Sequence, residues 1–265
     1  MRIPVACACF ALLSHQTVLA KPLQPAGKWV VDFGDSRCVA QRIYGEAGNP
    51  IYLHVKAPAV GDGLQLSVAV KGSNGYGVQE SAKLTFGNGA PIQLSQLRFG
   101  VEKKQVRMVN LTKAQIGQLA SASELRWSTA NLDYSMPLGP MGNLIKIVEK
   151  CRSTLGDYWN GTPEKMALLQ QTPTMNTTIR RLFSTNDYPS QAVFNDQSGT
   201  AHIVALIDEK GQMADCMVVE TSGAAVLDAQ TCIIMRKRGK FSPAVGADGK
   251  PAKGIFAQRV RWEMP

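Results

Sequence analysis

The stretch GTAHIVALIDEKGQMADCMVVET, from Gly199 to Thr221, decides the fold of the C-terminal third of this 265-residue chain. Residues 201–207 form an apolar run of strand length, and residues 212–221 form a second run of strand character. Asp208-Glu209-Lys210-Gly211 separates the two runs, and its glycine supplies the positive φ that a tight turn requires. The stretch therefore predicts an antiparallel β-hairpin.

A helix and a third strand are expected after the hairpin. Ser222-Gly223 breaks the second strand, and a helix is predicted from Leu227 to residue 238, where Gly239 ends it. Residues 236–238 are cations in the last turn, a position favoured by the helix dipole. The closing strand covers residues 255–262, and one of its faces carries Ile255, Ala257, Arg259 and Arg261.

The order of these elements resembles the C-terminal domain of TonB. The resemblance covers residues 185–263 and depends on turn and core positions that follow one another at matching spacings. These positions are Tyr188-Pro189, Gly199, Gly211, Ser222-Gly223, Leu227-Asp228, Phe241, Pro243-Ala244, Gly249 and the closing apolar strand. The resemblance implies a three-stranded antiparallel sheet with two helices on one face, and a function in peptide contact.

In the TonB family an exposed strand edge can accept an extended segment of an outer-membrane transporter. Main-chain hydrogen bonds provide affinity in such strand addition, and alternate side chains provide selectivity. A three-stranded sheet has two edges, and an uncovered edge is a template for another strand. We expect the closing strand to be that edge, so the candidate partner-binding residues are Ile255, Ala257, Arg259 and Arg261. Its two arginines either steer an acidic partner or only keep a bare edge soluble.

The chain before residue 160 is rich in strand signals. Leu64 to Val70 alternates apolar and polar residues with period two, as a half-buried strand does. Further β-prone runs cover residues 29–33, 38–44, 51–55, 83–86, 105–111 and 125–132. Thr112 can cap a short helix over residues 113–120. An amphipathic helix is predicted over residues 141–155, with Leu144, Ile147, Val148, Cys151 and Leu155 on its inner face.

These patterns predict an α+β protein with a mostly-β N-terminal domain, a packed helix, and a small TonB-like module. The expected organisation is a signal peptide at residues 1–20, the β domain at 21–159, a linker at 160–176 and the module at 177–265. A short helix fits residues 163–170 inside the linker. Residues 28–160 also resemble the invasion-associated locus B family of exported envelope domains, through Trp29, Cys38 to Arg42, Cys151, Leu155 and Trp159.

Residues 1–20 have the pattern of an export signal. A basic start at Met1-Arg2 precedes an apolar run at 5–13, and small or apolar residues at 18–20 precede Lys21. The alternative is a retained membrane anchor. The polar residues 14–17 disfavour it, because spanning a bilayer takes roughly 20 apolar residues.

Export decides how the cysteines are interpreted. Removal of the signal leaves Cys38, Cys151, Cys216 and Cys232, an even number that favours disulfides in an oxidising compartment and allows three pairings. Within the TonB-like module, Cys216 falls on the second strand and Cys232 on the helix expected to pack against it. We therefore predict a structural Cys216–Cys232 disulfide, with a redox-active thiol pair as the alternative. By elimination, Cys38 then pairs with Cys151.

The charge and the motifs point to a binding protein and not to an enzyme. The formal charge is +9, with 17 basic and 11 acidic residues between 21 and 173, so the excess is spread thinly over the first half. It fits attraction to anionic envelope surfaces, and no aromatic-basic pattern suggests nucleic-acid binding. His54 and His202 lie in strand patterns, and no hydrolase, zinc-protease or phosphate-loop motif occurs. We expect no catalytic residue, metal or cofactor.

The sequence thus predicts a periplasmic TonB-like protein that binds envelope or outer-membrane partners by strand-edge contact and is linked to TonB-dependent transmembrane transport. One alternative is an energy transducer held in the inner membrane by an uncleaved N-terminal segment. It is disfavoured because the chain lacks a long Pro/Lys-rich spacer. The other alternative is a structural envelope protein that forms homodimers through the module.

Overall fold

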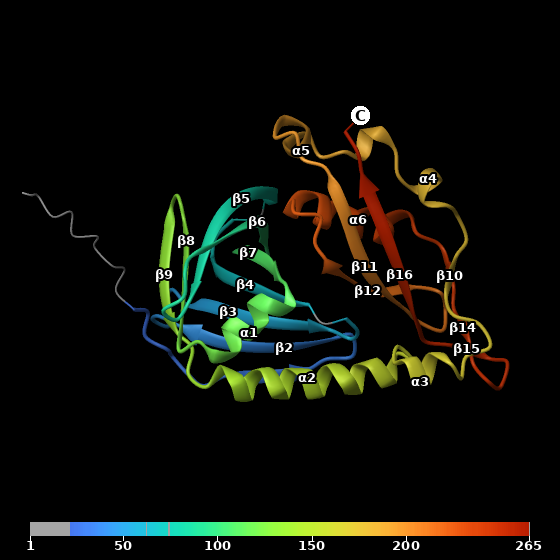
Figure 1. The fold of residues 1–265 in the computed structure, drawn as a ribbon, viewed down its shortest axis with the longest axis horizontal. Helices are drawn as coiled ribbons and strands as arrows, with labels where there is room; N and C mark the ends of the chain where they lie inside the picture. The colour runs from blue at the N-terminus through green and yellow to red at the C-terminus, as the bar shows by residue number, and fades with distance from the viewer. Residues whose placement is uncertain (1–21, 62, 74, 265) are drawn as a thin grey trace, which may run out of the picture.

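The protein combines helices and strands, as Figure 1 shows for the computed structural model, which describes residues 22–61, 63–73 and 75–264. The described chain begins with a large, mostly-β N-terminal domain, followed by a smaller module in which a helix packs on a sheet. This confirms the mixed fold class and the mostly-β first domain. The expected signal peptide lies outside the described residues.

Within the described residues, nine antiparallel strands form one sheet in the N-terminal domain. Their spatial order is β1-β2-β3-β4-β7-β6-β5-β8-β9. In chain order they are β1 (Val30–Phe33), β2 (Arg37–Tyr44), β3 (Ile51–Pro58), β4 (Leu64–Lys71), β5 (Gly75–Phe86), β6 (Ile92–Val101), β7 (Lys104–Leu111), β8 (Glu124–Thr129) and β9 (Leu132–Pro137).

The sheet curls until its two ends approach each other. The Leu23 N–H, just before β1, donates to the carbonyl oxygen of Ser135 in β9 at 2.8 Å. The hydroxyl of Tyr44 in β2 donates to the carbonyl oxygen of Pro137 at the end of β9, also at 2.8 Å. The concave face encloses the core, which includes the fully buried Trp127.

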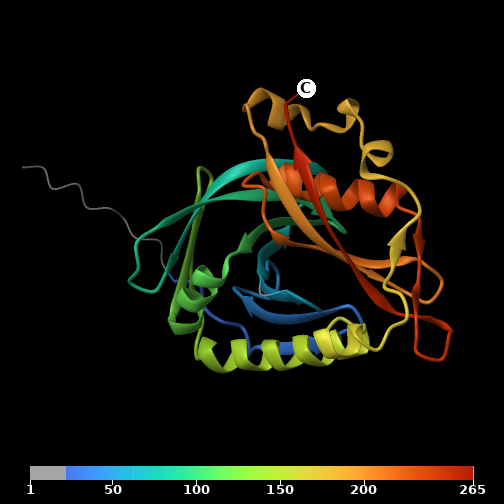
Figure 2. The ribbon, with the colours of Figure 1, turned by 45° about the vertical axis from the view of Figure 1, so that its right-hand side comes forward.

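Two helices cover the core of this domain. Helix α1 (Lys113–Ser121) begins with a capping box, in which Thr112 and Gln115 exchange side-chain and main-chain hydrogen bonds. Helix α2 (Met141–Tyr158) runs along β2 and β3, as Figure 2 also shows. A disulfide between Cys38 of β2 and Cys151 of α2 ties helix and sheet together, as predicted by elimination.

Three sequence expectations for this domain were wrong in detail. Residues 125–132 are not one strand but parts of the β8–β9 hairpin, which turns at residues 130–131. Strand β6 was not expected, because polar residues interrupt its apolar pattern. Ile147 was placed on the inner face of α2 but is 45% exposed, and Ile145 is buried instead. Helix α2 contacts the sheet through a narrow face, and Ile147 lies just outside that face.

The C-terminal module contains a three-stranded antiparallel sheet of spatial order β12-β11-β16. Its strands are β11 (Gly199–Ile207), β12 (Met213–Glu220) and β16 (Gly254–Trp262), and helix α6 (Ala225–Arg238) packs on one face. Gly211 has φ +76° in the β11–β12 turn, so the glycine serves the purpose expected of it. Its remaining elements are α4 (Ile179–Leu182), the 3-10 helix η1 (Thr185–Asp187), α5 (Ser190–Phe194), β13 (Phe241–Ser242), β14 (Ala244–Val245) and β15 (Pro251–Ala252).

Residues 160–176, the expected linker, run along the C-terminal module. They include the short helix α3 (Pro163–Met166) and the strand β10 (Thr174–Met175), which pairs with β13. The Asn160 side chain donates to the carbonyl oxygen of Lys253 at 2.9 Å, and the Gln170 N–H donates to that of Val245 at 2.9 Å. The segment is therefore hydrogen-bonded to the module along much of its length.

Strand β11 is buried on both faces, and this joins the two parts of the protein. Ile203, Ala205 and Ile207 point toward α6 and belong to the core of the module. Val204 and Leu206 point the opposite way and belong to the core of the N-terminal domain. One face of the module's sheet therefore carries α6, and the other face packs against the N-terminal domain (Figure 2).

Candidate functional site

Strand β16 forms one edge of the sheet in the C-terminal module. It pairs with β11 from Gly254↔Ile207 to Trp262↔Gly199, without a register shift. Among the described residues, no strand pairs with its outer side. A strand edge of this kind presents main-chain N–H and C=O groups that can pair with another extended chain.

The four predicted partner-binding residues of β16 share one face of the sheet but differ in exposure. Ile255 is buried, because the N-terminal domain and Gly161 cover this end of the strand. Ala257, Arg259 and Arg261 are exposed. Arg259 lies 3.3 Å from Glu220 of β12, and Arg261 lies 2.9 Å from Glu263. The accessible part of the edge therefore extends from Ala257 toward the C-terminus.

The opposite edge of the sheet, β12, lies against the N-terminal domain. The loop between β3 and β4 reaches Val219, so closely that a Cβ on Gly61 would come within 2.9 Å of its side chain. The side chain of Arg152 on α2 donates to the carbonyl oxygens of Gly61 and Gly63 and so holds this loop. The N-terminal domain thus contacts β12 near the end of the strand, at Val219.

A buried ion pair lies at the β12 edge. Asp215 of β12 is 1% exposed and accepts a hydrogen bond from Arg37 of β2. Arg236 of α6 approaches the same carboxylate to 3.5 Å. Burial raises the pKa of Asp215, while the two arginines and the Cys216 N–H oppose this rise. The contact joins β2, β12 and α6 through one carboxylate.

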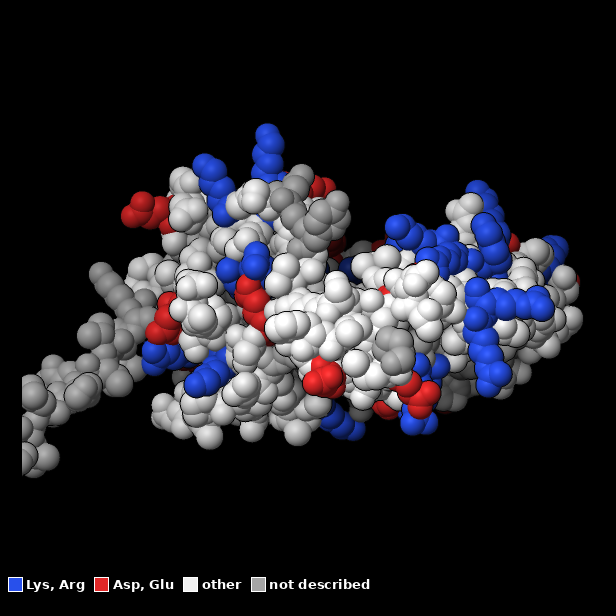
Figure 3. Space-filling model, turned by 90° about the horizontal axis from the view of Figure 1, so that it is seen from above, with Lys and Arg blue, Asp and Glu red and all other residues white. Residues whose placement is uncertain are grey.

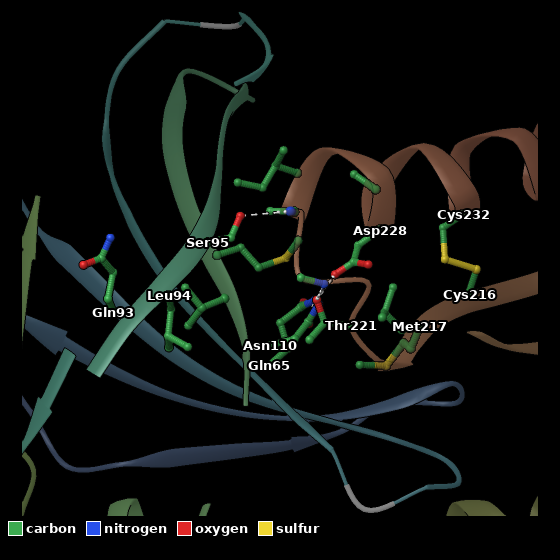
Figure 4. Close-up of a pocket in the computed structure, with 17 residues that line it drawn as sticks. Gln65, Gln93, Leu94, Ser95, Asn110, Cys216, Met217, Thr221, Asp228 and Cys232 are labelled. Carbon is green, nitrogen blue, oxygen red and sulfur yellow. Dashed lines mark hydrogen bonds between the residues drawn. A yellow bond between two sulfur atoms is a disulfide. The ribbon is translucent and has the colours of Figure 1, made fainter. Parts of the chain in front are cut away.

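Side chains of the N-terminal domain also cap α6. The residue before the helix is Ala224, which offers no side-chain acceptor. The Ala225 N–H instead donates to Ser95 Oγ of β6 at 3.0 Å, and the Val226 N–H donates to Gln79 Oε1 of β5 at 3.2 Å. Figure 4 shows the Ser95 contact. The absence of Ser, Thr, Asp or Asn at position 224 was the sequence signal for a cap from elsewhere.

A second set of contacts joins β5 to the region around α5. The Gln191 side chain pairs with the main chain of Gln79, accepting from its N–H at 2.8 Å and donating to its carbonyl oxygen at 2.7 Å. The Gln79 side chain also donates to Gln197 Oε1 at 2.8 Å. Sequence reasoning missed Gln79, because its environment exists only once the two parts of the chain have packed.

A cavity of about 280 Å³ lies between β6 and β7 on one side and β12 and α6 on the other (Figure 4). Asp228 lies at its wall, 3% exposed, and accepts hydrogen bonds from the Thr221 hydroxyl at 2.5 Å and the Ser222 N–H at 2.8 Å. Burial raises the pKa of Asp228, and these hydrogen bonds oppose the rise. The carboxyl group therefore holds the turn that leads into α6.

The Cys216–Cys232 disulfide lines the same cavity and joins β12 to α6, as predicted. Its loop spans 16 positions, for which the chain-entropy model gives about 3 kcal/mol of stabilisation. With Cys38–Cys151, both predicted disulfides are confirmed.

The two histidines of the described chain have structural surroundings. His54 contacts Gln41 Oε1 at 2.9 Å and Ser67 Oγ at 3.3 Å, and burial lowers its pKa to about 4. His202 lies half-buried, 3.7 Å from Glu220. No group of three or more His, Cys, Asp or Glu residues in the described ranges is arranged to hold a metal ion. A search of the same residues finds no helix long and apolar enough to cross a bilayer.

Basic side chains gather over the C-terminal module on the face shown in Figure 3. Exposed cations of this module include Arg180, Arg181, Lys237 and Lys240. The first half of the chain carries more of the formal excess charge, but this face of the smaller module displays it more densely.

Residues 184–264 match the family model described as Gram-negative bacterial TonB protein C-terminal. Among curated proteins and among solved structures, nothing matches the chain. The matched span differs from the expected 185–263 by one residue at each end, and it includes β11, β12, α6 and β16. The resemblance of residues 28–160 to the invasion-associated locus B family stays a prediction. Residues 184–264 of this chain are therefore similar to the TonB C-terminal family, as the sequence resemblance predicted.

Proposed function

We propose that this protein binds an extended segment of an envelope protein by adding it as a fourth strand beside β16. The partner class is an outer-membrane TonB-dependent transporter, and the role is accessory to transmembrane transport. The family match of residues 184–264 supports the class of function. One structural observation supports the place of binding: neither edge of the sheet pairs with another described strand, but the N-terminal domain contacts β12 at Val219 and Asp215.

The chemistry of the edge suits a generic main-chain contact with moderate electrostatic selectivity. Arg259 and Arg261 each have a carboxylate within 3.3 Å, but all four charged groups are well exposed. Exposed ion pairs contribute only about 0–1 kcal/mol, so an acidic group of a partner can compete for either arginine. Because Ile255 is buried, the side-chain selectivity of the edge would come from positions 257, 259 and 261.

We propose a binding role for the chain and no enzymatic one. The buried histidine and carboxylates have structural contacts: His54 lies between two polar side chains, and Asp215 and Asp228 connect neighbouring elements. We also propose a periplasmic location, which follows from the expected signal at residues 1–20. An uncleaved anchor in the inner membrane is the alternative, and sequencing the N-terminus of the mature protein distinguishes the two.

Hydrogen exchange along β16 tests the binding mode. The probe is a synthetic peptide that copies the periplasm-facing N-terminal segment of a TonB-dependent transporter, added to the mature protein with both disulfides formed. The N–H groups of a strand alternate in direction, so about half of the β16 amides lack a β11 partner and exchange quickly. We expect the peptide to slow exchange at those amides and to leave the β12 amides unchanged. Protection confined to other segments would contradict the proposal.

Proline variants separate edge binding from general destabilisation. Because N–H directions alternate, one of Ala257→Pro and Gln258→Pro removes an outward donor, and the other removes a donor to β11. The proline variant that removes the N–H group pointing away from β11 should keep most of its stability but lose affinity for the peptide. Ala257→Ser keeps the N–H group and should bind normally. Equal binding by both proline variants and the parent chain would exclude β16 as the binding strand. Light scattering of the free protein shows whether it is a dimer, as self-association through the module would require.

A further inference from the structure

A polar cavity lies in the N-terminal domain where β5 and β8 separate. The two strands pair from Phe86↔Leu125 to Lys83↔Ser128, after which β8 turns into β9. Residues 78–82 of β5 continue alongside β6 instead. The cavity between them has a volume of about 610 Å³. Cavities of this size accommodate small molecules, and sheet openings are common places for them. We call it the β5–β8 pocket.

The charged residues that line the β5–β8 pocket are three cations and one acid. Lys83, Arg98 and Arg107 provide the positive charges, and Glu80 provides the negative charge. The remaining lining is mostly polar and includes Ser81, Gln105 and Ser128. The pocket therefore has a net positive charge of 2 in a region partly removed from water.

Two of the cations are direct neighbours across the sheet. Arg98 of β6 pairs in register with Arg107 of β7, and like charges directly opposite each other on a sheet are destabilising. The pair therefore calls for a compensating negative charge. Glu80 is the one acidic residue in the pocket lining that the structure describes and could supply that charge.

Both oxygens of Glu80 are already engaged by other residues. Arg98 Nε donates to Oε1, and Gln96 Nε2 donates to Oε2 at 2.9 Å. Gln96 is fully buried and is itself fixed, because Trp127 Nε1 donates to its Oε1 at 2.9 Å. Glu80 is therefore held on Arg98 and Gln96 and cannot turn toward Arg107 without breaking this network.

Nε of Arg107 consequently lacks a close acceptor within the described part of the chain. Arg107 is 9% exposed, its Nε is 4.0 Å from Glu80 Oε2, and that distance exceeds a hydrogen bond. Nε of Arg107 is buried without a hydrogen-bond partner among the residues that the structure describes. Burial lowers the pKa of Arg107, with Arg98 adding to the effect and Glu80 opposing it. A guanidinium nevertheless stays charged, so the site holds a desolvated cation whose donors are not all satisfied.

We infer that the β5–β8 pocket binds a small molecule through an oxyanion group, a carboxylate or a phosphate, held by Arg98 and Arg107 with Lys83 at the rim. The planar guanidinium presents paired donors that match the oxygens of either group. An anion between the two arginines would accept hydrogen bonds from their guanidinium groups and relieve the repulsion across the sheet. This pocket is separate from the β16 edge, and its occupation does not depend on strand addition.

An NMR titration tests the inference on the mature, disulfide-bonded chain at low ionic strength. The probes are inorganic phosphate and succinate, with the uncharged succinamide as a control. We expect saturable shifts of the amides of residues 81–83 and 128–131, and an affinity that weakens as salt is added. Phosphate alone, succinate alone, or both would identify the oxyanion that the pocket prefers. If neither anion causes saturable shifts at these amides, the inference is wrong.

Charge-removing variants locate the binding groups. Arg98→Gln and Arg107→Gln should each weaken the better anion about tenfold or more, since each removes a charge-assisted hydrogen bond. Lys83→Gln, at an exposed position, should weaken it less and is not expected to disturb folding. Lys146→Gln on α2 removes the same charge far from the pocket and serves as the matched control.

The outcomes separate a site from general charge attraction and from misfolding. Arg107→Lys keeps the charge but not the fork of donors, so it should bind more weakly than the parent and remain folded. If Lys146→Gln weakens binding as much as Lys83→Gln and Arg98→Gln do, the anions respond only to net charge and the inference is overturned. A folded Arg98→Gln variant with unchanged affinity overturns it as well.

Discussion

His54 is a histidine whose surroundings favour its neutral form. Its ring lies in the sheet between Gln41 and Ser67, with Lys56 and Lys104 nearby. Burial is the largest cause that lowers its pKa to about 4, and the two lysines add to it. An unfolded chain has a histidine pKa near 6.5. The unfolded state therefore binds a proton between these two values that the native state does not bind.

This difference predicts that stability falls as the pH is lowered from about 7 to 4. The native state excludes the proton, so the free energy of unfolding should decrease by on the order of 2 kcal/mol through this window. His54→Gln removes the titrating group and should show a smaller decrease. Urea unfolding of both proteins at pH 7 and pH 4.5 measures the difference. Equal slopes for the two proteins would mean that His54 titrates normally in the native state.

Asp187 is a carboxyl group whose surroundings favour its charged form. Its carboxylate accepts two hydrogen bonds from Arg238, at 2.6 and 2.7 Å, and one each from the N–H and hydroxyl of Ser184. The bonds with Arg238 are the largest cause that lowers the pKa of Asp187 to about 2. The pair connects the 3-10 helix η1 to the last turn of α6.

The Asp187 contribution is present above the unfolded pKa of about 3.8 and is lost as the pH falls toward 2. Arg238 is half-exposed, so solvent screens the pair and the contribution to stability should be small. We expect Asp187→Asn to be less stable than the parent at pH 6, with the difference disappearing near pH 2. Asp196→Asn, at an exposed position, should change little at either pH. Urea midpoints at the two pH values provide the measurement.

Helix α6 depends on another domain for its N-terminal cap. Position 224 is alanine, and Ser95 and Gln79 of the N-terminal sheet accept from the first two N–H groups of the helix. An unsatisfied helix terminus in a buried interface is unfavourable, so these contacts connect the stability of α6 to that of β5 and β6.

Removing either cap should therefore destabilise the protein. We expect Ser95→Ala and Gln79→Ala each to lower the free energy of unfolding by about 1 kcal/mol, the usual cost of a lost N-cap. Ser81→Ala changes an exposed residue of β5 and is the control. Ala224→Ser offers the helix a cap of its own and should recover part of the loss in the Ser95→Ala background. Urea unfolding of the variants gives the values, and an unchanged Ser95→Ala midpoint would contradict the assignment.

Strand β6 shows why element prediction failed where two parts of the chain meet. Its sequence mixes polar and apolar residues because each face has a special environment. Gln96 points into the domain, where Trp127 and Glu80 satisfy it. Leu97 belongs to the core of the C-terminal module, and Phe99 packs against that core. An apolar residue on the outer face indicates a strand only when the element that covers it is known.

At the scale of the molecule, the two parts share cores and should unfold together. Val204, Leu206 and Ile255 of the module contribute to the first core, and Leu97 of the N-terminal domain contributes to the second. Separating the parts would expose these side chains as well as Asp215 and the first turn of α6. Because neither part keeps these contacts alone, we expect the N-terminal domain and the module to unfold in one cooperative transition.

We therefore expect a core substitution in the module to destabilise the N-terminal domain as well. Leu227 is fully buried, and Leu227→Ala should cost about 2–5 kcal/mol. Hydrogen exchange of slowly exchanging amides in β11 and in β3 should accelerate by similar factors in this variant. Val193→Ala, at an exposed site in α5, is the control. If only the amides of the module accelerate, the two parts unfold independently.

The sequence by itself determined the elements whose signals are local. Apolar runs and glycine turns specified β11, β12 and β16, Thr112 specified the start of α1, and the number of cysteines limited the disulfide pairings. The turn and core positions also carried the resemblance to TonB, which the family match of residues 184–264 confirms. These features depend on neighbouring residues, on regular spacing or on the order of a few positions. All of these can be read directly from the sequence.

Only the tertiary structure decided which edge is free and which residues join the two parts. The sheet of the module has two edges in any sequence-based description, and the N-terminal domain contacts the β12 edge through Arg37 and the loop near Gly61. The capping of α6 by Ser95 likewise brings together residues distant in sequence. Burial and charge at these places arise from long-range packing, and no local pattern encodes them.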